Sequence, residues 1–225
     1  WSSDEMAAGY LIYKDGVFAA FTADPEYAIE PGDNAEYTVR AVSRHGVTTS
    51  AVPMREAAPA FPTAEGFGKY TTGGRGGAVV KVTKLTDDGT EGTLRWAFQQ
   101  HPDEPLTIVF DVNGEIRLGS ALEVNRADWT LAGQTAPGDG ISIVGNKVNF
   151  GFSQNFIVRN VRFRSGDERQ DQACGTENCA NYIFDHCVFG WSMEENMNTA
   201  DSHFLTVQWS IVHEGLNDAG HQKGA

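Results

Sequence analysis

The chain has 225 residues, 25 of them glycine, and a formal net charge of −13 at neutral pH. Its 11% aromatic and 21% charged content is typical of a turn-rich folded protein and not of a disordered one. Such an acidic chain is a poor partner for nucleic acid, and no apolar run reaches the roughly 20 residues that a membrane-spanning helix needs. An anionic ligand would therefore need local positive charge from lysine, arginine or a metal ion.

The N-terminal segment, residues 1–53, reads as alternating strands and polar turns. Its first strand runs into Asp15 and Gly16, a pair that favours a two-residue hairpin turn, and residues 35–42 alternate between two faces. The segment resembles the later strands of a fibronectin type III module, a β-sandwich, with Tyr37 as its corner tyrosine and residues 48–52 as its last strand. The opening strands of such a sandwich are missing. We expect a partial module, with a simple β-rich cap as the alternative.

A linker and a glycine-rich segment follow. Residues 54–62 are rich in proline and alanine, which predicts a semi-rigid connection. Residues 64–77 carry many glycines, which permit turns with positive φ. They precede the strand at residues 78–83, so they do not form a phosphate-binding fingerprint. Residues 92–101 have helical spacing, and we expect this helix to cap the open end of a β structure.

The second half of the chain repeats itself. Residues 155–163, 181–189 and 203–211 share one pattern, and their starts lie 26 and 22 residues apart. Repeats of this length, made of short strands, are typical of a coil-stacked fold, here a parallel β-helix. A β-sandwich with similar strands is the alternative. The alignment predicts one polar and one apolar column of stacked side chains: Asn160, His186 and Gln208, and Phe163, Phe189 and Ile211.

The three cysteines carry little functional information. Cys174 and Cys179 could close a small loop by a disulfide, and Cys187 should point inward as a small buried residue. A zinc site is not expected, because no second pair of ligands stands at a suitable spacing.

A specific resemblance covers residues 63–225. The glycine-rich opening, the helix and the segments 110–116 and 130–138 are together similar to the start of a pectate lyase of the parallel β-helix type. The similarity is most specific at residues 181–187, a strand ending in Asp-His-Cys, and in the acidic segment 191–196 that follows. The resemblance implies an all-β chain whose main domain is a right-handed parallel β-helix.

The resemblance also implies a reaction, the β-elimination of polygalacturonate. The proton at C5 is removed and the glycosidic oxygen leaves from C4, so charge develops next to the uronate carboxylate. Calcium, a hard cation with oxygen ligands, can neutralise this carboxylate and reconcile an acidic protein with an acidic polymer. By resemblance the calcium ligands are Asp171 and Glu194, with Glu195 as the alternative to Glu194. Asn198 stands where the family often has an aspartate, and an amide would be a weaker ligand.

Asp185 and His186 invite comparison with an acid–base pair, but a structural role is favoured. Adjacent strand residues point to opposite faces, so the two should not interact directly, and His186 belongs to the polar column that we expect in the interior. Lys223 resembles a lysine that contacts the substrate carboxylate, with a disordered tail as the alternative.

The arginine that removes the proton in this family has no match in the chain, and we expect it beyond Ala225. The chain would then be an incomplete portion of a longer protein that is secreted, periplasmic or on the cell surface, and monomeric when complete. A lyase of methyl-esterified pectin is a less suitable interpretation, because such enzymes need no calcium and replace the acids by aromatic residues. A non-catalytic β-helix that binds glycans or serves in surface attachment is the alternative from another class.

Overall fold

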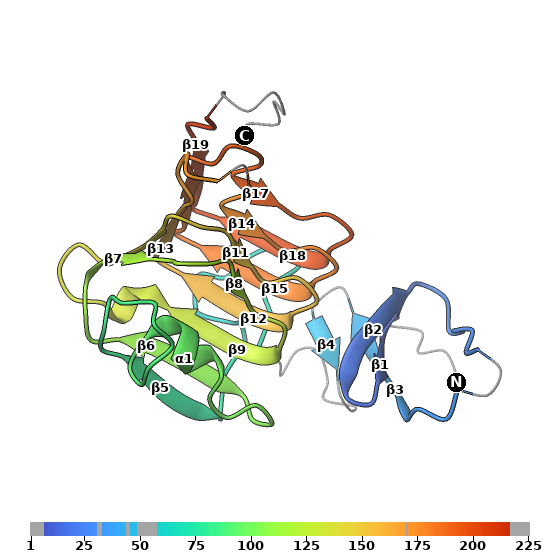
Figure 1. Cartoon of the computed structure of the whole chain (residues 1–225). Helices are drawn as coiled ribbons and strands as arrows, with labels where there is room; N and C mark the ends of the chain where they lie inside the picture. Colours follow the sequence, from blue (N-terminus) through green and yellow to red (C-terminus); the bar gives the residue numbers. More distant parts are fainter. Residues whose placement is uncertain (1–6, 31–32, 44–45, 49–57, 170, 217–225) are drawn as a thin grey trace.

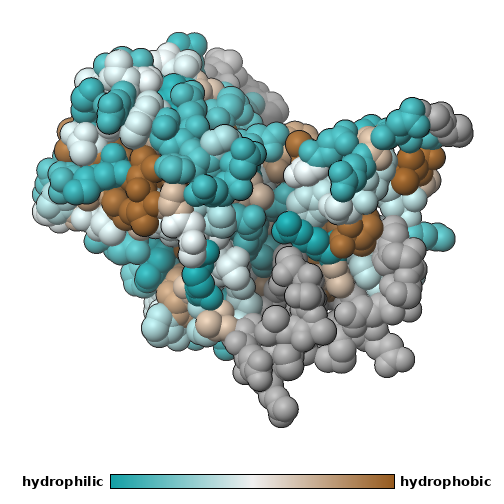
Figure 2. Space-filling model, turned by 90° about the horizontal axis from the view of Figure 1, so that it is seen from below, coloured by the Kyte–Doolittle hydropathy of each residue, from teal (hydrophilic) through white to brown (hydrophobic). Residues whose placement is uncertain are grey.

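The computed structural model describes residues 7–30, 33–43, 46–48, 58–169 and 171–216. They form a small antiparallel sheet, called here the N-terminal sheet, and a parallel β-helix beside it (Figure 1). Seen from below, these two parts form two lobes with a mostly hydrophilic surface (Figure 2). Within the described ranges, no helix is long and apolar enough to cross a membrane.

The N-terminal sheet contains β1 (Ala7–Lys14), β2 (Val17–Thr22), β3 (Tyr37–Ser43) and β4 (Gly46–Thr48), in the order β2-β1-β3-β4. The predicted hairpin turn is confirmed, because Asp15 and Gly16 both have positive φ, 51° and 79°. The predicted last strand at residues 48–52 falls largely outside the described residues. What the structure describes of this segment is one antiparallel sheet, which is half of a sandwich at most.

The β-helix begins with β5 (Ala78–Val82) and α1 (Leu94–Phe98). The next two turns comprise β6 (Leu106–Phe110), β7 (Gly114–Arg117), β8 (Leu122–Glu123), β9 (Ala127–Ala132), η2 (Gly133–Thr135), β10 (Ile141–Val144) and β11 (Val148–Asn149). The remaining strands are β12 (Gln154–Arg159), β13 (Val161–Arg164), β14 (Cys174–Gly175), β15 (Ala180–Asp185), β16 (Val188–Gly190), β17 (Met197–Asn198), β18 (His203–Gln208) and β19 (Ile211–His213).

These strands form three parallel sheets. The six-stranded sheet has the order β18-β15-β12-β9-β6-β5, the five-stranded sheet β19-β16-β13-β10-β7, and the short-strand sheet β17-β14-β11-β8. The turns that begin with β6, β9, β12 and β15 each contribute one strand to every sheet, whereas the β5 turn adds a strand to the six-stranded sheet only and the last turn adds β18 and β19. The turns stack as a right-handed parallel β-helix, the expected hand for parallel crossovers. The predicted β-helix is therefore confirmed.

Stacked aromatic rings fill the interior. Trp129, Phe156 and Tyr182 occupy matching positions of the six-stranded sheet, with successive ring centroids 4.5 and 4.6 Å apart and planes within 6° of parallel. Phe163 and Phe189 stack at 5.3 Å, as the repeat alignment predicts. Such rings add specific contacts to the free energy of burying apolar area.

The third repeat, residues 203–211, is offset by one residue from the alignment that the sequence predicts. His203 pairs with Ala180, so Gln208 pairs with Asp185 and not with the residue after it. Trp209 then follows Asn160 and His186 in the column, and all three have a left-handed φ of 50–55°. In the apolar column Val212, not Ile211, continues from Phe189. The reason is that the connection into β18 is one residue longer than the similarity of the sequences suggests.

The side chains around Cys187 also differ in part from expectation. Cys187 is buried, as predicted, but His186 is an exposed turn residue and does not lie in the interior, because its left-handed backbone turns the side chain outward. Cys174 and Cys179 are both buried free thiols, so the possible disulfide between them is not formed.

The helix caps the first turn, as expected (Figure 1). It is shorter than predicted, and its buried residues Leu94, Ala97 and Phe98 join the main core next to β5. Thr93 is the N-cap, and its Oγ1 accepts a hydrogen bond from Trp96 N at 3.3 Å.

The glycine-rich segment is a strap across the outer face of the six-stranded sheet. Gly68 N donates to Thr206 Oγ1 on β18 at 2.9 Å, and Gly74 N donates to Thr130 Oγ1 on β9 at 3.0 Å. A Cβ at Gly68 would lie 2.3 Å from Tyr182 O, and one at Gly74 would lie 2.1 Å from Leu106 O. Glycine is therefore needed here for close approach to the sheet.

Candidate functional site

The short-strand sheet presents polar side chains on its outer face. Each of its strands has two residues, so one side chain points into the core and the next points out. Leu122, Val148 and Cys174 are buried at matching positions. The outward column contains Glu123, Asn149, Gly175 and Asn198, and Asn149 Nδ2 donates to Glu123 Oε2 at 2.6 Å.

The structure brings Asp171 and Glu194 together at the entrance to this sheet. They lie in the turns that lead into β14 and β17, and Glu194 N donates to Asp171 O at 3.3 Å. Asp171 Oδ1 accepts from Gln172 N at 2.8 Å and lies 3.7 Å from Lys147 Nζ. Both residues are partly exposed, and the two successive turns that carry them stack on one side of the molecule.

The other predicted residues lie on the same turn as Glu194 or in the segments that follow. Glu195 follows Glu194 on the same turn, and its backbone oxygen accepts from Ala173 N at 3.1 Å. Asn198 uses its amide in the turn after β17, where Oδ1 accepts from Ala200 N at 2.8 Å. Lys223 lies outside the described residues. Among the described residues, no group of three or more His, Cys, Asp or Glu side chains is arranged to hold a metal ion.

Two neighbours of Asp171 were missed by reasoning from the sequence. Lys147 brings an ammonium group to this face from the preceding turn. Gln172 is 7% exposed, and its Oε1 is buried without a hydrogen-bond partner. A Cβ at Gly175 would lie 2.9 Å from this oxygen and 3.1 Å from Asn149 Oδ1, so a larger residue at position 175 would crowd both amide oxygens.

The side chains of Asp171, Glu194 and Gln172 offer oxygen atoms of carboxylates and an amide. Oxygen donors of this type are those that hard cations such as Ca²⁺ prefer. An unpartnered buried oxygen costs free energy unless a donor or a cation meets it. The donor set of Asp171, Glu194 and Gln172 thus fits a hard cation by its chemistry. It is also incomplete without further oxygen ligands from water or from a bound anion.

Asp185 is at the centre of a separate buried network on the six-stranded sheet. Its fully buried carboxylate accepts from Arg159 Nε at 2.8 Å and Gln208 Nε2 at 2.8 Å, and it lies 3.0 Å from His186 Nδ1. Burial acts to raise the pKa of Asp185, but the hydrogen bonds from Gln208, Arg159 and His186 outweigh it and lower the pKa. The Arg159 guanidinium lies 4.0 Å from the Phe61 ring.

This network contradicts the expectation that Asp185 and His186 do not interact, and it agrees with the expectation of a structural role. Asp185 and His186 do interact directly, because His186 is a left-handed turn residue and the alternation of an extended strand does not apply to it. Gln208, which binds Asp185, also donates to Thr63 O at 3.1 Å and accepts from Glu65 N at 2.9 Å. The buried acid therefore ties the sheet to the strap, a structural role.

Comparison with known proteins gives relatives for the β-helix. No protein-family model matches the sequence. Probable pectate lyase C of Emericella nidulans is 42% identical over 163 residues, which is 70% of this chain and 37% of that protein. Probable pectate lyase C of Aspergillus oryzae is 40% identical over 160 residues, with the same shares. The chain thus spans little more than a third of the length of the curated relatives that it matches.

A solved structure shares the fold. The crystal structure of Jun a 1, the major allergen from cedar pollen, matches 64% of this chain and 47% of its own chain, with a TM-score of 0.55 and 24% sequence identity. At that identity the likeness concerns the fold alone. Together with the relatives at about 40% identity, it makes the fold a pectate lyase-like β-helix.

Proposed function

We propose that this chain is part of a calcium-dependent pectate lyase that cleaves polygalacturonate by β-elimination. The observation that carries the proposal is the placement of Asp171 and Glu194 on successive turns, beside an unpartnered amide oxygen of Gln172. The similarity of 70% of the chain to proteins named probable pectate lyase C supports the reaction class.

In this proposal Asp171 and Glu194 hold the calcium ion, with Glu195 as the alternative to Glu194. Gln172 Oε1 can add a neutral oxygen ligand. Asn198 is a weaker candidate, because its amide oxygen is already bonded to Ala200 N. Calcium, when bound, supplies positive charge that neutralises the uronate carboxylate and stabilises the charge that develops beside it.

The reaction itself needs a base and positive charge from the protein. A base takes the C5 proton, the C–H electron pair forms the C4=C5 double bond, and the C4–O bond breaks, with the oxygen leaving as a hydroxyl after protonation. The family resemblance assigns the base to an arginine, and we assign none of the described residues to that role. Lys147 adds positive charge on the acidic face near Asp171, and Lys223 is kept as the substrate-binding lysine.

The proposal also covers the N-terminal segment and the location of the protein. The order β2-β1-β3-β4 matches one sheet of an immunoglobulin-like sandwich, which supports the resemblance of residues 1–53 to a fibronectin type III segment. A polymeric pectic substrate is encountered outside the cell, so we propose an exported protein, monomeric when complete.

The test combines a binding assay with an activity assay. Calcium binding to this chain is measured by calorimetry for the wild type, for Asp171→Asn and for Asp201→Asn, an exposed acid on another turn that serves as the control. We expect Asp171→Asn to abolish binding and Asp201→Asn to leave it unchanged. Equal binding by all three would refute the proposed ligand set.

Activity is measured as ultraviolet absorbance of unsaturated uronide released from polygalacturonate. This chain and a version extended through further turns are each assayed with calcium and with chelator. Calcium-dependent release by the extended protein alone would support the lyase and assign the base to residues outside this chain. No release from either protein would favour a non-catalytic, glycan-binding β-helix.

A further inference from the structure

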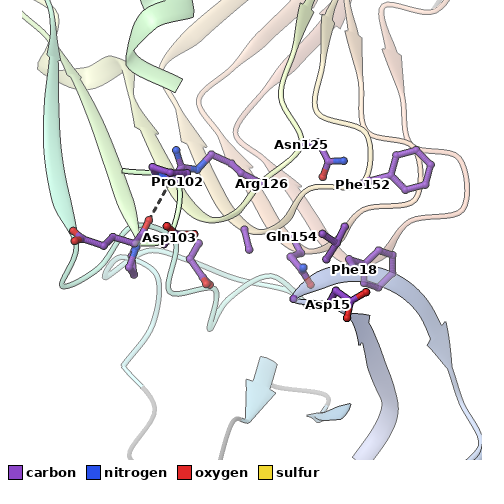
Figure 3. Close-up of a pocket in the computed structure, with 14 residues that line it drawn as sticks. Asp15, Phe18, Pro102, Asp103, Asn125, Arg126, Phe152 and Gln154 are labelled. Carbon is purple, nitrogen blue, oxygen red and sulfur yellow. Dashed lines mark hydrogen bonds between the residues drawn. The ribbon is translucent and has the colours of Figure 1, made fainter. Parts of the chain in front are cut away.

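A cleft lies between the β1–β2 hairpin and the β-helix, away from the turns that carry Asp171 and Glu194. It has a volume of about 420 Å³, within the range of roughly 300–1,000 Å³ that is usual for small-molecule sites. Figure 3 shows Phe18 from the hairpin and Phe152 from the β-helix together at one end of it, with Asn125 and Gln154 nearby. Asp103 and Arg126 lie at the other end (Figure 3).

Phe152 is an unusual residue for its position. It occupies the turn between β11 and β12 with a left-handed φ of 62°, and Asn178 and Asp201 hold the matching turn positions above it with φ of 54° and 51°. Asparagine and aspartate tolerate this conformation, whereas a bulky side chain is strained in it. Phe152 is nevertheless 51% exposed, so core packing does not explain its presence. Strained residues that are not explained by packing are often functional.

The charged groups around the cleft favour an uncharged ligand. Four acidic residues line it, namely Asp15, Asp103, Glu104 and Asp128. The one basic residue of the lining is Arg126, whose guanidinium donates to four backbone oxygens at 2.8–3.1 Å, those of Phe98, Gln100, His101 and Glu104. A uronate would therefore meet net negative charge, while the hydroxyl groups of a neutral sugar would meet hydrogen-bond acceptors.

We propose that this cleft binds an uncharged glycan, with the apolar face of a pyranose ring packed on Phe152 beside Phe18 and the ring hydroxyls donating to carboxylates of the lining. An aromatic platform with a few polar groups is a common composition of such a binding site. The site needs both lobes of the molecule, because Phe18 comes from the N-terminal sheet and Phe152 from the β-helix. This proposal does not depend on whether the face with Asp171 and Glu194 takes part in cleaving polygalacturonate.

The test is affinity electrophoresis of the chain in gels that contain soluble galactan, arabinan, β-glucan or, with chelator present, polygalacturonate. Phe152→Asn removes the ring but installs the residue that the next turn carries, so the fold is retained and circular dichroism checks it. Phe67→Asn, at another exposed phenylalanine on the strap (58% exposed), is the matched control.

We expect at least one neutral polysaccharide to retard the wild type. Phe152→Asn should weaken that binding about tenfold, equivalent to about 1.4 kcal/mol, and Phe67→Asn should leave it unchanged. The proposal is overturned if no neutral polysaccharide retards the wild type, or if Phe152→Asn binds as well as the wild type. It is also overturned if polygalacturonate is the polymer whose binding depends on Phe152.

Discussion

Replacing Asp185 by asparagine should destabilise the β-helix strongly, although the change in shape is small. The carboxylate is fully buried and forms an ion pair with Arg159 at 2.8 Å, while the Arg159 side chain is 24% exposed. Asp185→Asn removes the negative charge and leaves the guanidinium beside the Phe61 ring without its counter-ion. The hydrogen bond from Gln208 loses its charged acceptor in the same step.

Breaking a buried ion pair on one side costs about 3–5 kcal/mol. The lower end, about 3 kcal/mol, applies here because Arg159 can reach water. For a chain of this size about 1 kcal/mol changes Tm by about 2–4 °C, so we expect Tm to fall by about 6–12 °C. The matched control is Asp111→Asn, at the exposed pair that Asp111 forms with Lys81 at 3.3 Å, where the expected cost is about 0–1 kcal/mol.

The pH dependence follows from the direction of the pKa shift. The pKa of Asp185 is lowered in the folded state, and its unfolded value is about 3.9. Its stabilisation is therefore fully present above about pH 4 and is lost as the pH falls through the folded pKa. Urea midpoints of wild type and Asp185→Asn should differ by a constant amount between pH 5 and 7 and converge in acid. A Tm change below about 2 °C, or a gap that persists in acid, would refute this account of the network.

Three further outcomes are expected. Phe152→Asn should raise the free energy of unfolding by about 0.5–1 kcal/mol, because asparagine suits the left-handed backbone, and a lower urea midpoint would contradict this. Gly74→Ala should lower the free energy of unfolding by about 1–3 kcal/mol, since the new Cβ would lie 2.1 Å from a carbonyl oxygen. The control Gly89→Ala meets no atom within 4 Å and should cost only the strain of its φ of 73°. Burial raises the pKa of Cys179 and of Cys187 to about 12, so a thiol reagent at pH 8 should react with neither until the chain unfolds, and fast reaction of the native protein would exclude their burial.

The repeats were sufficient to predict the β-helix, but they did not reveal the lengths and conformations of the turns between its strands. Phe163 and Phe189 could be aligned because strands of several residues around them alternate apolar and polar side chains. The step to Val212 failed by one residue, since the length of a turn leaves no periodic pattern in the sequence. His186 was placed in the interior because strand alternation was applied to a residue with φ of 54°.

Only those residues of the candidate site that match the family resemblance one by one could be predicted. Asp171 and Glu194 were named as neighbours on successive turns, and their backbones share a hydrogen bond, while their role as metal ligands stays a prediction. Lys147 and Gln172 were missed, because two-residue strands are too short to show the register that brings them beside Asp171. The glycines of the strap were recognised as permissive turns, but their close approach to Leu106 O depends on a long-range contact that the segment alone does not reveal.

The unequal strand lengths explain why both proposed sites lie in turns at the ends of the short-strand sheet. The six-stranded sheet is held by stacked rings such as Trp129 and Phe156, and a changed strand length there would disrupt the ladder. The short-strand sheet has two residues per strand, so the turns at its ends can differ in length and sequence without moving that core. Asp171 lies at one end of these strands and Phe152 at the other. The proposed cation face and the proposed cleft for a neutral glycan can therefore both be built, and varied, on the same rigid stack.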